Sequence, residues 1–159
     1  MAEISGRLRP VGRVAILVSR YNEMVTSRLL EGARACCREA GIADPDVDVV
    51  WLPGAFELGG AAAAAAATGS YACIVALGAV IRGDTAHFEF VAGEAARGLG
   101  EVAVRHALPV AFGVLTTDTL DQALARAGGA AGNKGHEAAF AAITSADALA
   151  QLRERHAAS

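Results

Sequence analysis

Runs of apolar residues alternate along the chain with segments in which apolar residues recur at helical spacing. The apolar runs predict four strands, at residues 14–18, 47–52, 72–81 and 109–115. The helical pattern predicts helices at residues 24–40, 57–68, 87–106, 120–127 and 137–155. This alternation favours parallel strands joined by right-handed crossovers, and strands that are apolar throughout favour a sheet covered on both faces. We therefore predict an α/β fold, a three-layer α/β/α sandwich around a four-stranded parallel sheet.

Residues 1–12 do not follow this alternation. Ile4 and Leu8 give a weak strand signal, and a detached short strand of this kind often pairs with a neighbouring subunit. A frayed tail is the alternative. At 159 residues the chain is long enough to bury a core, and we predict a single domain over residues 1–159 with residues 1–12 as an N-terminal arm.

Composition narrows the classes of partner. The net charge is −3 and the basic residues are scattered, which argues against nucleic-acid binding. The N-terminus lacks the pattern of a secretory signal, and the alanine run at residues 61–67 is too short to span a bilayer, so we expect a cytoplasmic protein without a membrane segment. The apolar fraction rests heavily on alanine, which buries little area per side chain, and this favours an oligomer.

The three cysteines, Cys36, Cys37 and Cys73, do not have the spacing of metal ligands. Adjacent cysteines on a helix point to different sides and cannot easily bridge to each other, and Cys73 lies inside an apolar run. We expect reduced, structural thiols and no metal site.

Candidate chemistry concentrates at the strand–turn–helix junction of residues 78–90. Gly83 permits a sharp turn, Asp84 or Thr85 is expected to cap the following helix, and His87 lies just inside it. Unpaired N–H groups and the positive end of a helix dipole make such a junction a natural anion site. With an imidazole beside it, the junction suggests chemistry on a phosphorylated small molecule. The alternative is a junction that binds nothing and a histidine that only caps the helix or lies on the surface.

Ligands of open parallel sheets bind beyond the carboxyl ends of the strands, and unusual residues follow each predicted strand of this chain. Tyr21 can stack on an aromatic ligand or pack over the sheet edge. Gly54 allows the backbone to approach a ligand closely, and Phe56 is either core or a pocket wall. Glu57 can accept hydrogen bonds from polyol hydroxyls or complement a helix dipole.

Arg126 and Lys134 flank a glycine-rich segment of the chain. They are either solvated cations near a helix C-terminus, or Arg126 grips a phosphate with two hydrogen bonds. There is no Walker loop in the sequence and no Gly-x-Gly-x-x-Gly after the first predicted strand, which argues against ATP and NAD.

Five segments occur in order between the predicted strands and helices: RYN at 20–22, PGAFE at 53–57, GAVIRGDTAH at 78–87, FGVLTT at 112–117 and AGGAAGNKG at 127–135. Together they resemble the 6,7-dimethyl-8-ribityllumazine synthase family, from about Gly12 to the C-terminal helix. The resemblance implies a flavodoxin-like topology and a transferase at the penultimate step of riboflavin biosynthesis. The implied reaction condenses 5-amino-6-(D-ribitylamino)uracil with 3,4-dihydroxy-2-butanone 4-phosphate to the lumazine, phosphate and water, with no metal or organic cofactor.

The resemblance also implies roles for individual residues. Tyr21 stacks on the pyrimidine, Glu57 binds the ribityl hydroxyls and His87 is the proton donor. Further contacts to the pyrimidine substrate come from Ala55, Phe56, Ala79, Val80, Ile81 and, from the adjacent subunit, Phe112. The phosphate is bound by Asp84, Thr85 and Arg126, and additional candidates are Asn22, Gly83 and Lys134.

The family forms homopentamers with active sites between neighbouring subunits, and in many members twelve pentamers close a 60-subunit icosahedral shell. The compact segment at residues 128–135 resembles that of shell-forming members, and riboflavin synthase is a candidate cargo or pathway partner. Alternatives are a flavin- or lumazine-binding module, a structural shell protein, and riboflavin synthase activity on the same scaffold. His87 and Arg126 argue against a mere binder, because a binder needs neither a proton donor nor a phosphate site.

Three features depart from the family pattern. Gly59 and Gly60 stand where members commonly have proline, which predicts a looser pocket floor. Tyr21 replaces the more usual phenylalanine or tryptophan and keeps the stacking face. Asp84 puts a carboxylate beside a phosphate site, so we expect its side chain to turn toward Arg82 or to cap its own helix.

Overall fold

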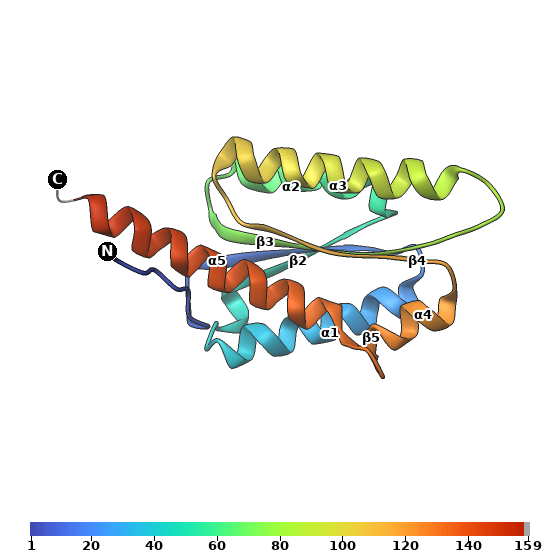
Figure 1. Cartoon of the computed structure of the whole chain (residues 1–159), viewed down its shortest axis with the longest axis horizontal. Helices are drawn as coiled ribbons and strands as arrows, with labels where there is room; N and C mark the ends of the chain where they lie inside the picture. The colour runs from blue at the N-terminus through green and yellow to red at the C-terminus, as the bar shows by residue number, and fades with distance from the viewer. Residues whose placement is uncertain (158–159) are drawn as a thin grey trace.

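The computed structural model describes residues 1–157 and has three layers (Figure 1). The middle layer is a four-stranded parallel sheet, as the sequence predicts, and its strand order is β2-β1-β3-β4. Its strands are β1 (Arg13–Ser19), β2 (Val47–Leu52), β3 (Tyr71–Ile81) and β4 (Val110–Thr117). β1 and β3 are therefore neighbours in the sheet, although β2 lies between them in the sequence. The strand order reverses at this point, and open α/β sheets bind ligands at such a switch point.

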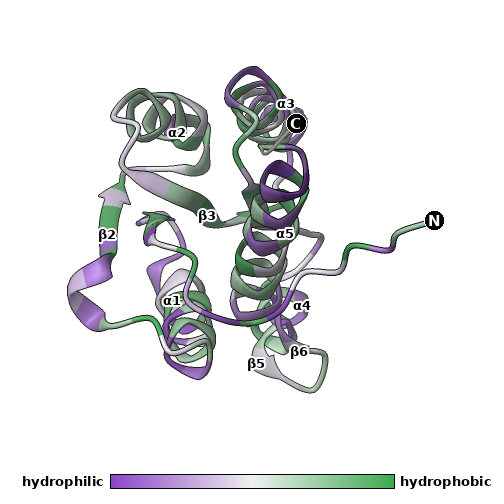
Figure 2. Cartoon of the chain, turned by 90° about the vertical axis from the view of Figure 1, so that its left-hand side faces the viewer, coloured by the Kyte–Doolittle hydropathy of each residue, from purple (hydrophilic) through white to green (hydrophobic). Residues whose placement is uncertain are grey.

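The helices cover both faces of the sheet, with α1, α4 and α5 on one face and α2 and α3 on the other (Figure 2). They are α1 (Glu23–Glu39), α2 (Leu58–Ala67), α3 (His87–His106), α4 (Leu120–Ala125) and α5 (Lys134–Ala157). Short 3-10 turns, η1 (Asp44–Asp46) and η2 (Ala55–Glu57), flank β2. The glycine-rich segment forms a small antiparallel hairpin of β5 (Ala127–Gly129) and β6 (Gly132–Asn133).

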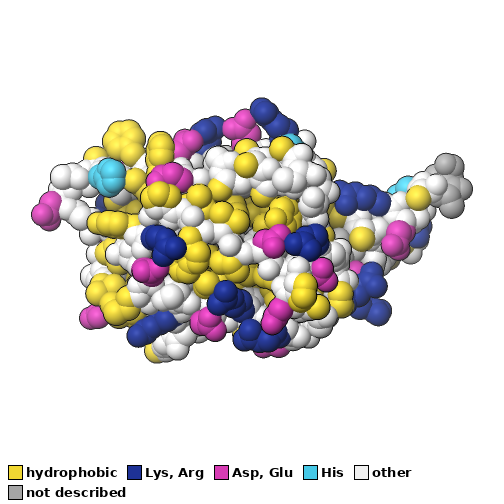
Figure 3. Space-filling view, turned by 180° about the vertical axis from the view of Figure 1, so that it is seen from behind, with side chains coloured by type: hydrophobic (Ala, Val, Ile, Leu, Met, Phe, Trp, Pro, Cys, Tyr) yellow, Lys and Arg dark blue, Asp and Glu magenta, His cyan; other side chains and the backbone are white. Residues whose placement is uncertain are grey.

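The core has one hydrophobic cluster on each side of the sheet. β1 and β3 contribute to both clusters, because their successive side chains point to opposite faces and both faces are covered. β2 is the edge strand on one side, and Val50 is exposed there. Figure 3 views this side and shows hydrophobic side chains reaching the surface between the two helical layers.

The pairing of α2 with α3 depends on Gly59 and Gly98. A Cβ added at either glycine would lie 3.2 Å from the Cα of the other, which is closer than most real contacts of this kind. Gly60 faces open space. The expected looseness is therefore wrong for Gly59, because the missing side chain lets two helix backbones pack directly together.

The two helix boundaries beside the glycine-rich segment differ from the predicted ones. α5 starts three residues earlier than expected, at Lys134. The Asn133 Oδ1 atom accepts the N–H groups of Gly135 at 2.8 Å and His136 at 3.1 Å, which satisfies two donors of the first turn. α4 ends at Ala125, and the chain passes through Arg126 into the β5–β6 hairpin.

The N-terminal arm forms no strand within the described part of the chain. It lies instead on the chain's own α5, where the Arg7 N–H donates to Asp147 Oδ2 at 2.7 Å and Arg9 Nε donates to Asp147 Oδ1. Gln151 Nε2 also donates to the Ser5 carbonyl at 2.9 Å. The predicted strand at Ile4 and Leu8 is thus absent from the single chain, and pairing with a neighbour stays a prediction.

All three cysteines are free and buried, as expected for structural thiols. Burial raises the pKa of Cys36 and of Cys73 to about 12, so both are protonated thiols at neutral pH. Within residues 1–157, no helix is long and apolar enough to cross a membrane.

Candidate functional site

The segments that follow β1 and β2 are joined to each other at the carboxyl end of the sheet. The Arg20 N–H donates to the Leu52 carbonyl at 2.8 Å, and the Tyr21 N–H donates to the Pro53 carbonyl at 3.0 Å. These bonds continue the parallel pairing of β1 with β2 past the last strand residues. Tyr21 and the 53–57 segment therefore share one rim, as the sequence predicts.

Asn22 ties this rim to β3. Its Nδ2 donates to the Ala79 carbonyl at 2.8 Å, and its backbone is left-handed, with φ of 63°. Asparagine tolerates this conformation better than most residues. The bond sets the position of the carboxyl end of β3 relative to Tyr21, so Asn22 is a positioning residue of the rim.

Two aromatic side chains on the rim are exposed, Tyr21 at 75% and Phe56 at 57%. Rings of this size seldom stay in water without a binding role when they gather in one place. The Glu57 carboxylate lies beside Gly54, where an added Cβ would be 3.7 Å from Oε1. Glu57 is exposed, and its carboxylate has no hydrogen-bond partner within the described residues. Its oxygens are available to hydroxyl groups of a ligand.

The turn between β3 and α3 differs from the prediction at its cap. The N-cap of α3 is Ala86, and no side chain caps the helix there. Thr85 Oγ1 accepts only a long bond of 3.4 Å from the His87 N–H, and Asp84 makes no hydrogen bond within residues 1–157. The Glu89 N–H donates to the Ala86 carbonyl at 3.1 Å, so the N–H groups of His87 and Phe88 are the ones available to an anion, with the helix dipole behind them.

His87 is the first residue of α3 and is exposed. Its imidazole makes no hydrogen bond or ion pair in the part of the chain that the structure describes. The side chain thus lies beside the uncapped first turn of α3, and both ring nitrogens are available to a ligand.

Arg82 is held by partners that sequence reasoning missed. Its Nη1 pairs with Glu89 at 2.5 Å, its Nε pairs with Asp118 at 2.9 Å, and its guanidinium lies 4.4 Å from the Phe88 ring centre. The hydrogen bond to Glu89, followed by that to Asp118, raises the pKa of Arg82, and the Arg82 guanidinium lowers the pKa of Glu89. The expected turn of Asp84 toward Arg82 is wrong, because these two carboxylates already occupy the guanidinium.

A second group of predicted residues lies at the other edge of the sheet. Phe112, Arg126 and Lys134 line one cavity of about 390 Å³ between β4 and the start of α5. Arg126 Nη1 donates to the Gln122 carbonyl at 2.9 Å, which caps the C-terminus of α4, and Lys134 Nζ pairs with Glu137 at 3.2 Å. Both cations therefore have local partners, as one of the two interpretations of the sequence expected.

Within the chain, Arg126 also lines a cavity of about 340 Å³ with Arg82 and Phe88, close to the turn between β3 and α3. Neither Tyr21 nor His87 lines the cavity of Phe112 and Arg126. β2 and β4 are the opposite edges of the sheet, and the aromatic rim follows β1 and β2. Within the chain, Tyr21 therefore lies toward one edge of the sheet, and Phe112 lies at the other edge.

Comparison with known proteins identifies the family of the chain. Residues 12–150 match the family model described as 6,7-dimethyl-8-ribityllumazine synthase, so the chain belongs to that family. One relative is the 6,7-dimethyl-8-ribityllumazine synthase of Edwardsiella ictaluri (strain 93-146). It is 51% identical over 145 residues, which cover 91% of this chain and 93% of the relative.

Proposed function

We propose that this chain is a 6,7-dimethyl-8-ribityllumazine synthase, a transferase of riboflavin biosynthesis. It condenses 5-amino-6-(D-ribitylamino)uracil with 3,4-dihydroxy-2-butanone 4-phosphate. Family membership over residues 12–150 carries the proposal, and a single domain over residues 1–159 is part of it. The exposed Tyr21, the unpaired Glu57 and the unpaired His87 on one rim support it.

The pyrimidine substrate stacks on Tyr21 and lies against Phe56, with its ribityl hydroxyls donating to Glu57. The backbone of residues 79–81 borders the ring. Asn22 supports this contact, because its bond to the Ala79 carbonyl holds the end of β3. Phe112 of a neighbouring copy closes the pocket from the other side.

The phosphate of the second substrate binds at the N-terminus of α3, where Thr85 and the free N–H groups face it. Gly83 and Asp84 form the turn that leads into this site, and the exposed Asp84 is free to turn its carboxylate to solvent. Arg126 of the neighbour completes the phosphate site, and Lys134 adds positive charge beside it. To reach the phosphate, Arg126 exchanges its bond to the Gln122 carbonyl for charge-assisted bonds.

Each chemical step moves a proton. An amine attacks the ketone, an imine forms, phosphate leaves, and the ring closes with loss of water. An imidazole titrates near neutral pH and suits this work, so His87 is the proton donor. Holding two reactive substrates together supplies much of the remaining acceleration.

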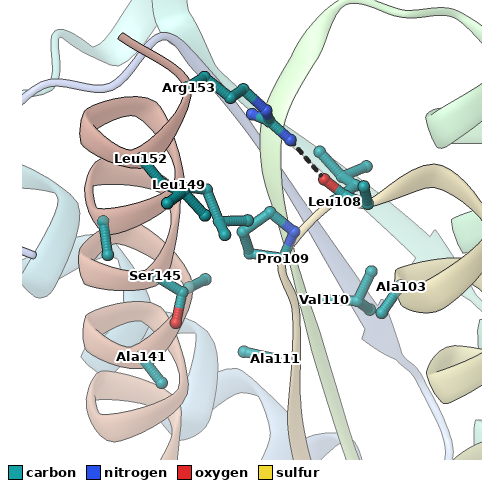
Figure 4. Close-up of a pocket in the computed structure, with 13 residues that line it drawn as sticks. Ala103, Leu108, Pro109, Val110, Ala111, Ala141, Ser145, Leu149, Leu152 and Arg153 are labelled. Carbon is teal, nitrogen blue, oxygen red and sulfur yellow. Dashed lines mark hydrogen bonds between the residues drawn. The ribbon is translucent and has the colours of Figure 1, made fainter. Parts of the chain in front are cut away.

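The assembly we propose is a homopentamer, with twelve pentamers in a 60-subunit shell as its larger form. The outer edge of β4 supports a neighbour, because no strand pairs with it in the described chain. Beside it lies an apolar groove of about 660 Å³ between β4 and α5, lined by Pro109, Leu149 and Leu152 (Figure 4). An unpaired edge strand beside exposed apolar side chains is usually covered by a partner.

Two wider assignments belong to the same proposal. The protein is cytoplasmic, and riboflavin synthase is its pathway partner or cargo. A lumazine-binding module without activity is the main competing function, but it has no use for a proton donor at His87 or a cation at Arg126.

Mixing the purified protein with the two substrates and following the absorbance of the lumazine tests the activity directly. We expect product formation without any added metal or cofactor. Tight binding of the lumazine without turnover would identify a binding module instead.

Arg126→Ala is expected to raise KM for the phosphorylated substrate by about tenfold or more. An equal rise for both substrates would contradict the phosphate role.

Co-expression of two impaired variants, assayed with the phosphorylated substrate well below the KM of Arg126→Ala, tests whether the site is shared between copies. His87→Ala damages one half of the site and Arg126→Ala damages the other. In a random mixed assembly, about a quarter of the interfaces combine two intact halves, so activity should return. If the site lay within one chain, the mixed assembly would be no more active than its parents.

A further inference from the structure

The α1–α5 contact, away from the rim, brings together three side chains that can bind metals. Cys36 and Glu39 lie one turn apart on α1, and His136 lies in the first turn of α5. Their ligand atoms, one from each side chain, are all within 4.8 Å of one another. Figure 1 shows α1 and α5 in the same helical layer, so residues distant in sequence meet here.

The three donor atoms are of the types that bind Zn²⁺. A thiolate, an imidazole and a carboxylate are the ligands that Zn²⁺ uses in proteins, at about 2.0–2.3 Å. Tetrahedral bonds of this length place neighbouring ligand atoms about 3.3–3.8 Å apart. The His136 Nε2 and Glu39 Oε2 atoms are 2.8 Å apart, so they need to separate slightly while the sulfur approaches. The Glu39 side chain is 55% exposed and can make this adjustment.

We propose that Cys36, Glu39 and His136 form a Zn²⁺ site with three protein ligands and a fourth position open to water. The site does not depend on the proposed catalytic function. The bound ion joins the end of α1 to the start of α5 and so acts as a clip between two helices. Zinc coordination replaces the proton of the Cys36 thiol, and no other reactant is needed.

The clip lies close to Lys134, the first residue of α5 after the β5–β6 hairpin. His136 follows Lys134 by two residues, and its backbone N–H already bonds Asn133 Oδ1 at 3.1 Å. Asn133 Nδ2 in turn donates to the Arg28 carbonyl on α1 at 3.1 Å. A metal on His136 therefore reinforces an existing connection between α1 and the segment that presents Lys134.

Cobalt provides a spectroscopic test, because Co²⁺ occupies zinc sites and reports on its ligands. Untagged protein freed of metal by a chelator is titrated with Co²⁺ and then with Zn²⁺. We expect one Co²⁺ per chain, a thiolate-to-cobalt charge-transfer band in the near ultraviolet, and loss of this band when Zn²⁺ is added. Zn²⁺ should also raise the thermal unfolding midpoint of the wild-type protein.

Variants separate this site from other thiols and histidines. Cys36→Ser is expected to abolish the charge-transfer band, and His136→Gln is expected to weaken Zn²⁺ binding by at least about tenfold. Cys37→Ser and His106→Gln are the controls, because neither side chain belongs to the cluster, and both should bind as the wild type does.

Three results would overturn the proposal. They are absence of stoichiometric binding, a cobalt spectrum without a thiolate band, and unchanged Zn²⁺ affinity in His136→Gln. His136 lies partly exposed, so its variant stays informative even if Cys36→Ser folds poorly. Any of these results would reduce the cluster to an imidazole–carboxylate hydrogen bond beside a buried thiol.

Discussion

The two ends of the sheet differ in how far their charged side chains are paired within the chain. At the amino end, Asp48 accepts bonds from the Arg13 guanidinium at 2.8 Å and from the Tyr71 hydroxyl at 2.7 Å. Asp147 accepts the Arg7 N–H and the Arg9 guanidinium there as well. These charged groups are paired with one another within the chain. Their hydrogen bonds join the N-terminal arm to α5 and connect the first residues of β1, β2 and β3.

At the carboxyl end, Arg82 is paired with Glu89 and Asp118, but other charged or titratable side chains have no such partner within residues 1–157. The side chains of Glu57, Asp84 and His87 make no hydrogen bond or ion pair within residues 1–157. Groups that the fold does not use can bind a ligand, whereas groups already paired contribute to stability. We therefore expect substitutions at the carboxyl end to change the rate and those at the amino end to change stability.

The largest effect is expected for His87→Ala. Loss of a general acid typically costs about 100-fold or more in kcat, while pyrimidine binding and stability should change little, because the imidazole makes no hydrogen bond or ion pair within residues 1–157. Steady-state kinetics and thermal unfolding measure the two quantities. His106→Ala, at the other end of α3, is the matched control, and an unchanged rate in His87→Ala would remove this residue from the mechanism.

Gly59→Ala tests whether the carboxyl end also contains a position needed for stability. The added methyl group meets the Gly98 backbone, so we expect a loss of about 1–3 kcal/mol in the free energy of unfolding. Gly60→Ala next to it meets nothing and should stabilise α2 by about 0.5–1 kcal/mol. Denaturant unfolding at one protein concentration measures both. Equal effects would mean that the glycine contact does not determine the α2–α3 packing.

Asp147→Asn should lower the thermal unfolding midpoint by a few degrees and leave kcat unchanged. The amide nitrogen of asparagine is a donor and cannot replace a carboxylate oxygen opposite the Arg7 N–H and the Arg9 guanidinium. Asp44→Asn, an exposed position, is the control. A fall in kcat as large as the one in His87→Ala would contradict the expectation that the amino end of the sheet affects stability and the carboxyl end affects the rate.

The smallest expected effect is the pH dependence of stability. The Arg7 N–H and then the Arg9 guanidinium lower the pKa of Asp147, and the Tyr71 hydroxyl and then Arg13 lower the pKa of Asp48. A lowered pKa in the folded state gives stability that is present above the ordinary value of about 4 and is lost as the pH falls through the folded value.

The thermal unfolding midpoint should therefore decrease as the pH is lowered from about 5 to about 3. Glu89 and Glu94 also have lowered pKa values and contribute with the same sign. Asp147→Asn should accordingly show a shallower fall than the wild type, without abolishing it. Parallel curves for the two proteins would mean that Asp147 contributes nothing to the acid transition.

Local patterns predicted the elements well. α3 runs from His87 to His106 and β2 from Val47 to Leu52, as expected from spacing and apolar runs, because both signals depend on near neighbours in sequence. The cap of α3 and the early start of α5 were missed. Asn133 caps α5 with a single side-chain atom, and a signal of this kind is weak beside a hydrophobic pattern.

Periodicity and motif order in the sequence were enough to predict the three layers, the parallel sheet and the residues of the rim. Contacts between distant residues were decided only by folding: Asn22 with Ala79, Arg82 with Asp118, and Cys36 with His136. These contacts depend on the strand order β2-β1-β3-β4 and on which helix faces meet. A linear pattern records the apolar face of each element but not its partner, and the partner is set by packing across the whole core.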